Sequence, residues 1–162
     1  MPRRLSVGTV VLICAGAIAA IAQQSSSALV DAQHKRMQPE QAEAAFGNAV
    51  QMTVFGDPSK PGLYAIRRRF KPGEMTRPHY HDQARLVTVI KGTWYTGEGD
   101  VFRPDATIPI KAGGFMYHPK GFHHYDGAKN EEVIVQIIGM GPVRTIGSEV
   151  DAHGRPLPTS YH

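Results

Sequence analysis

Cysteine is almost absent from this chain, whose 162 residues contain a single one, Cys14. Cys14 lies in an apolar N-terminal stretch that we expect to be removed from the mature protein. The mature chain would then have no disulfide, no thiolate metal ligand and no cysteine nucleophile. Functions that depend on a thiolate are therefore excluded.

A large excess of one charge is also missing. The full chain carries a net charge of +4, and without Arg3 and Arg4 its 16 basic residues face 14 acidic ones, which leaves +2. So small a surplus argues against a nucleic-acid partner. Residues 67–69 form a local run of three arginines, but side chains alternate between two faces along a strand. We interpret this run as a solvated strand edge.

The N-terminal stretch has the features of a secretory signal peptide. Arg3 and Arg4 precede an apolar run over residues 5–22, which ends in the small-x-small pattern of Ala20 and Ala22. We predict that residues 1–22 are cleaved and that the mature protein is periplasmic or secreted, with no membrane contact after cleavage. The alternative is a retained anchor, since 18 residues approach the length that spans a bilayer. The cleavage pattern favours removal.

The remaining chain is rich in turn residues, with 17 glycines and 12 prolines overall. This composition favours short strands over long helices, and no repeat of fixed period is visible. We expect a linker with a short helix at 23–48, one all-β domain at 49–146, and a loose tail at 147–162. The expected strands are 50–55, 63–70, 86–90, 93–96, 107–110, 115–118 and 133–138.

Histidines cluster within the predicted β region. His79 and His81 are two residues apart, so on a strand they share a face at a spacing of roughly 6–7 Å. Both imidazoles can then converge on one metal ion, with each nitrogen about 2.1 Å away. His118, His123 and His124 form a second cluster about 40 residues further along. Two clusters on separate strands of one barrel indicate a metal site more strongly than one pair does.

The spacing of these residues resembles the two sequence motifs of the cupin superfamily. Gly73-x5-His79-x-His81-x3-Arg85-x6-Gly92 is similar to the first motif, and Gly113-x5-Pro119-x-Gly121-x2-His124 is similar to the second. The chain departs from the pattern twice. Arg85 stands where the first motif usually has glutamate, and Ala128 stands where the second ends in asparagine. The similarity covers roughly residues 50–143 and is that of a small single-domain bacterial cupin.

The resemblance implies an all-β jelly roll, or double-stranded β-helix barrel, with the metal held inside its mouth. It places His79, His81 and His124 on the ligand positions of the family. The fourth ligand does not carry over, because a guanidinium has no lone pair to offer. Gln83 is the nearest substitute oxygen donor, although we favour interpreting it as a turn residue. The three-histidine set does not select among Fe, Mn, Zn, Ni and Cu.

Two interpretations of Arg85 are evenly balanced. A fixed cation beside a metal dication is repulsive unless an anion lies between them, so Arg85 would hold an anionic group of the substrate. In the other interpretation Arg85 forms an ion pair with Asp82 or Glu74 at the rim of the barrel. His118 is expected to be a partly exposed strand end or a partner of the ligands, and His123 should face away from His124.

We therefore expect an exported metal-dependent enzyme that acts on a small oxygen-rich or anionic molecule. Dioxygenase chemistry is the favoured reaction, because cupins with three histidine ligands include such enzymes. No base and nucleophile pair is readable, so catalysis would depend on the metal. The alternative is a non-catalytic protein that uses the same pocket to bind a small molecule or a metal. Whether two copies associate into a homodimer stays open.

Overall fold

The computed structural model describes residues 36–158. The chain divides into two units, Met1–Gln41 and Ala42–His162, and all of the strands belong to the second. Within the described residues, no helix is long and apolar enough to cross a membrane. The expected signal peptide lies outside the described residues. The elements are α2 (Pro39–Phe46), β1 (Gln51–Phe55), β2 (Gly62–Phe70), β3 (His79–His81), β4 (Arg85–Lys91), β5 (Thr93–Glu98), η1 (Pro104–Ala106), β6 (Ile108–Lys111), β7 (Phe115–His118), β8 (His124–Gly127), β9 (Val133–Gly141) and β10 (Thr145–Gly147).

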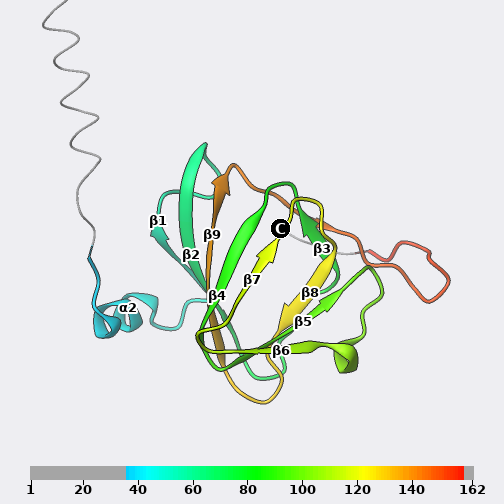
Figure 1. Ribbon diagram of the computed structural model, residues 1–162, viewed down its shortest axis with the longest axis horizontal. Helices are drawn as coiled ribbons and strands as arrows, with labels where there is room; N and C mark the ends of the chain where they lie inside the picture. The colour runs from blue at the N-terminus through cyan, green and yellow to red at the C-terminus, as the bar shows by residue number, and fades with distance from the viewer. Residues whose placement is uncertain (1–35, 159–162) are drawn as a thin grey trace, which may run out of the picture. The chain divides into compact units, whose positions relative to one another are not determined.

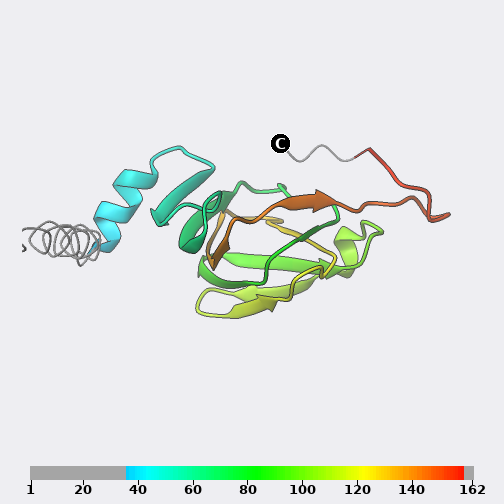
Figure 2. The ribbon, with the colours of Figure 1, turned by 90° about the horizontal axis from the view of Figure 1, so that it is seen from above.

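The strands form two antiparallel sheets that face each other (Figures 1 and 2). One sheet has the order β1-β2-β9-β4-β7, and the other has the order β10-β3-β8-β5-β6. Neighbours in these sheets are often distant in sequence, as where β9 lies between β2 and β4. This is the all-β jelly roll that the sequence predicts.

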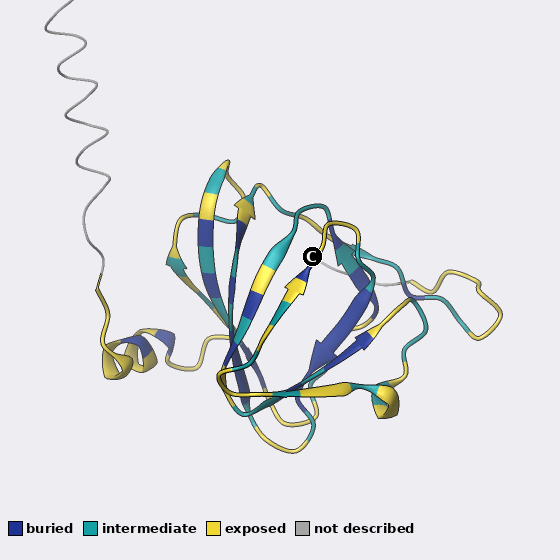
Figure 3. Ribbon diagram, viewed as in Figure 1, coloured by how far each residue is buried: buried dark blue, intermediate teal, exposed yellow. Residues whose placement is uncertain are grey.

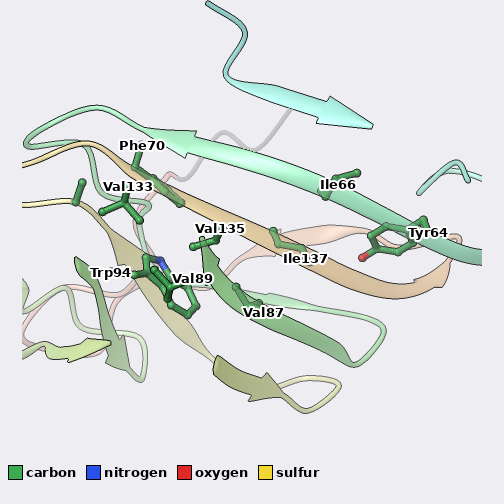
Figure 4. Close-up of a cluster of buried hydrophobic side chains, with 10 residues drawn as sticks. Tyr64, Ile66, Phe70, Val87, Val89, Trp94, Val133, Val135 and Ile137 are labelled. Atoms are coloured by element: carbon green, nitrogen blue, oxygen red, sulfur yellow. The ribbon is translucent and has the colours of Figure 1, made fainter. Parts of the chain in front are cut away.

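The hydrophobic core fills the space between the sheets, and its side chains come from alternate positions of the strands (Figure 4). On β9, Val133, Val135 and Ile137 point inward, and Trp94 of β5 faces them from the other sheet. Alternation with period two is what a strand with one buried face requires. Strand β8 is buried along its whole length (Figure 3), because it runs through the middle of its sheet.

All seven predicted strands are present, with bounds that shift by a few residues, and the predicted helix is α2. Strands β3 and β8, which carry the histidines, are only three and four residues long. β10 was not anticipated.

The arginine run is not a solvated strand edge, so that prediction is wrong. β2 lies between β1 and β9. Arg68 shares the inward face with Ile66 and Phe70 and lines a cavity. Arg69 is buried, with its guanidinium 4.2 Å from the ring centre of Phe46. The run was misinterpreted because charge alone does not reveal what covers a strand.

The segment after Gly147 is not a loose tail as far as residue 158. The buried carboxylate of Glu149 accepts hydrogen bonds from Arg77, one of them over 2.9 Å. The backbone N–H groups of Ser148 and Val150 donate to the carbonyls of Pro78 and Asp100 over 3.0 and 2.9 Å. The sequence did not predict these contacts, because they are made by single residues and leave no periodic pattern.

Candidate metal centre

Strand pairing brings three histidines together inside the barrel. His79 of β3 lies directly opposite His124 of β8, and His81 points to the same face two residues along β3. One ring nitrogen from each residue lies within 4.8 Å of the other two. All three residues are buried. The prediction that His79, His81 and His124 converge is confirmed, and these three side chains could bind one metal ion.

The three rings share one tautomer. Nδ1 of His79 lies 2.8 Å from the carbonyl of Arg77, and Nδ1 of His124 lies 2.8 Å from the carbonyl of Phe122. A carbonyl only accepts, so each Nδ1 must carry the proton. In His81, Nε2 receives a hydrogen bond from Arg85, which places its proton on Nδ1 as well. Nε2 is therefore the unprotonated nitrogen of each ring, and in His81 it accepts the hydrogen bond from Arg85.

This arrangement fits a metal ion. Nε2 of His124 is buried and has no hydrogen-bond partner among residues 36–158. A buried nitrogen without a partner is costly, and a metal ion held between the three rings would satisfy it. Hydrogen bonds from Nδ1–H to backbone carbonyls orient ligand histidines in this way.

Burial keeps the imidazoles neutral. Loss of hydration lowers the pKa of His124 to about 3. Burial also lowers the pKa values of His79 and His81, and the positive charge of Arg85 lowers that of His81 further. At neutral pH, protons therefore do not compete with a metal for these nitrogens.

Arg85 points into the barrel, so the rim interpretation is wrong. Its Nη2 donates to Nε2 of His81. The acids proposed as its partners are engaged elsewhere, Asp82 with Arg144 and Glu74 with Arg68. Among the described residues, no carboxylate forms an ion pair with Arg85. Burial lowers the pKa of Arg85, but a guanidinium stays charged in a protein.

Gln83 lies in the bend between β3 and β4 and is not among the residues that line the cavity. Its position supports the interpretation as a turn residue and offers nothing for a ligand role.

Sequence reasoning missed Asp126. This carboxylate is buried and lines the cavity with His79 and His81. Its Oδ2 lies 3.8 Å from Nε2 of His124. Burial alone would raise the pKa of Asp126, but the histidines and Arg85 around it hold that pKa below its usual value. The spacing His124-x-Asp126 on a strand could have revealed it, by the argument that paired His79 with His81.

His118 is not the partly exposed strand end that was expected, although a role as partner of the ligands stays compatible. It is 1% exposed, its ring centre lies 3.9 Å from that of His124, and burial lowers its pKa to about 4. Neither of its ring nitrogens has a hydrogen-bond partner within the described part of the chain. His123 faces away from His124, as expected, and stacks on Tyr80.

A cavity of about 150 Å³ adjoins the histidines. His81, Arg85 and Asp126 line its polar side, and Val87, Trp94 and Ile137 line its apolar side. The cavity also reaches Gln51 and Thr145, which are exposed, so it opens to the surface there. A small pocket of apolar walls with a few converging polar groups is the usual form of a ligand site.

Comparison with known proteins places this site in a family. The sequence model of the Cupin family matches residues 39–159. Among curated proteins, germin-like protein subfamily 3 member 2 of Arabidopsis thaliana is 34% identical over 65 residues, which cover 40% of this chain. Those residues span 29% of that relative's length.

Solved structures share the fold. Polyketide cyclase RemF from Streptomyces resistomycificus matches with a TM-score of 0.57 at 14% identity, covering 74% of this chain and 89% of the other. A cupin 2 domain-containing protein from Halorhodospira halophila matches with a TM-score of 0.53 at 20% identity, covering 66% and 73%. Identities this low show a common fold and no more.

Proposed function

Because the chain belongs to the cupin family and gathers three histidines inside its barrel, we propose that it is a metal-dependent enzyme acting on a small anionic molecule. We favour an oxygenase reaction and export to the periplasm or beyond. The observation that carries the proposal is the cluster of three buried, neutral imidazoles, in which one ring nitrogen of each residue lies within 4.8 Å of the other two.

His79, His81 and His124 would hold the metal through Nε2. A divalent ion held by three neutral ligands would keep its charge, and it would supply Lewis-acid chemistry or activation of dioxygen. For His81 to join, the guanidinium of Arg85 must withdraw from its Nε2. The withdrawn guanidinium would then be free to hold the anionic group of the substrate.

Asp126 has an electrostatic role in this proposal. Its negative charge offsets part of the positive charge of Arg85. The side chain of Thr76 contacts the same carboxylate and restrains it, with Oγ1 3.4 Å from Oδ1 of Asp126.

A non-catalytic binding protein is the second candidate, and one contact favours it. Arg85 already occupies the lone pair of His81, so one of the three ligand positions is filled by a side chain of the protein itself. A pocket that holds an anion through Arg85 without any metal would have this arrangement.

Metal analysis of the exported protein, purified without added metal, tests the proposal. We expect about one divalent ion per chain, consistent with one three-histidine site. His124→Ala should lose the ion and His123→Ala should keep it, because His123 faces outward. Equal metal contents in the two variants would contradict the site.

Oxygen uptake with a panel of organic acids then tests the reaction, and no uptake by metal-loaded protein favours the binding role.

A further inference from the structure

We infer that Arg68 forms a second anion subsite in the cavity, separate from Arg85, and that the ligand is a small acid with an anionic group at each end. The inference rests on the proposed function in one respect, that the ligand of this cavity is anionic. It adds a residue that lies outside the metal cluster and narrows the class of ligand to diacids.

Arg68 is held in place with donors to spare. Its guanidinium lies 4.9 Å from the ring centre of Phe70, on the inward face of β2. Nη2 donates to Oε1 of Glu74 over 3.2 Å, and this is its one ion pair in the described chain. Nε is buried and has no hydrogen-bond partner among the described residues. A buried N–H without an acceptor is costly, so an anion in the cavity would satisfy it.

Arg85 also has a buried donor without an acceptor. Its Nε is also buried without a hydrogen-bond partner in residues 36–158. The two guanidinium groups line one cavity and repel each other. The charged residues of the lining are thus two arginines against one carboxylate, Asp126. With neutral imidazoles the lining itself has a positive surplus, while Glu74 pairs with Arg68 from outside the lining. A divalent ion would increase the positive charge of the lining.

The two arginines stand at different levels of the barrel. Arg85 lies across from Gly139, which in turn lies across from Tyr64 on β2. Arg68 is four residues further along β2, so its backbone lies about 13 Å from this level along the strand. The two guanidinium groups enter one cavity from separate strands and from separate levels, so each can hold an anionic group of its own. A ligand with an anionic group at each end would engage both arginines.

The cavity limits the size of that ligand. Its volume of about 150 Å³ equals the volume that about five water molecules occupy in liquid water. The apolar wall of Val87, Trp94, Val135 and Ile137 suits a short hydrocarbon segment between two anionic ends. A diacid of about three to five carbons is therefore the class of ligand we expect, by the size argument above.

Calorimetric titration of the mature chain with malonate, succinate and glutarate tests the inference. Each diacid is compared with the monoacid of the same carbon number, namely propionate, butyrate and valerate. We expect at least one diacid to bind about tenfold tighter than its monoacid, the effect of one added charge-assisted contact. Trp94, the single tryptophan of the chain, lines the cavity and gives a fluorescence readout.

Neighbouring arginines supply the matched control. Arg68→Met should bring the diacid down to the affinity of the monoacid. Arg67→Met should leave the preference intact, because Arg67 is on the opposite face, with Nε 3.3 Å from Oε1 of Gln136. Arg85→Met should weaken diacid and monoacid alike. Should Arg68→Met fail to fold, Arg68→Lys keeps the charge but loses the fork of donors, and it should reduce the preference.

Equal affinities for diacid and monoacid in the wild type would overturn the inference. Equal effects of the Arg68 and Arg67 substitutions would overturn it as well. The titrations are run on metal-free and on metal-loaded protein, so the two proposals fail separately. A diacid preference without any metal-dependent activity leaves this inference standing and removes the proposed reaction.

Discussion

At the scale of single residues, this site differs from the family motif in the strand that carries its carboxylate. Strand β4 offers Arg85 where the family usually has a carboxylate, while strand β8 offers a buried carboxylate, Asp126. Metal, arginine and aspartate would lie around one small cavity. A cation next to a metal ion weakens metal binding, and a nearby anion offsets that effect.

Arg85→Glu tests this balance. The substitution removes the guanidinium from Nε2 of His81 and introduces the carboxylate that the family motif usually supplies. We expect tighter metal binding, by about tenfold or more, because a negative ligand replaces a positive neighbour. Binding of organic acids should weaken, because attraction becomes repulsion. Titrations of wild type and variant with the same metal measure both effects, and unchanged metal affinity would exclude competition by Arg85.

At the scale of elements, one ion pair attaches the segment after β10 to the chain before β3. Glu149 is 5% exposed, and its partner Arg77 also lies 3.9 Å from the ring centre of Phe102. If a buried carboxylate loses its partner, the free-energy penalty of its desolvation remains and nothing compensates for it.

Arg77→Ala should therefore lower the free energy of unfolding. Arg77 is half exposed, so we expect a loss of about 2 kcal/mol, less than for a fully buried pair. The matched control is Arg155→Ala in the same segment, whose pair with Asp151 is exposed and should matter little. Urea denaturation of the three proteins gives the comparison. Similar urea midpoints for the two variants would mean that the ion pair between Arg77 and Glu149 does not stabilise the fold.

At this scale most of the strands were predictable, because alternating apolar residues and glycine turns mark them locally. Strands β3 and β8 are too short for a periodic signal and were recognised through their histidines instead. β10 and its attachment could not be predicted, since Thr145 pairs with His81 across 64 positions of sequence.

At the scale of the whole molecule, export is the remaining prediction. We expect mass spectrometry of the exported protein to show a chain that begins at Gln23 or within a few residues of it, because the pattern ending at Ala22 suits signal peptidase. Replacing Ala20 and Ala22 by bulky residues should retain the uncleaved precursor. An intact N-terminus on membrane-bound wild-type protein would instead support the retained anchor.

The sequence by itself determined the fold family and the three candidate ligands. Both follow from local information, because the spacing of His79, His81 and His124 relative to glycines and proline can be read from the sequence alone. No knowledge of side-chain packing is needed for it. The same local reasoning could not decide where Arg68, Arg85 and Asp126 point. Whether a charged side chain faces water or a cavity depends on which strands lie beside it and on the side chains opposite. In this protein β9, from far along the chain, lies between β2 and β4 and so places both arginines in one cavity.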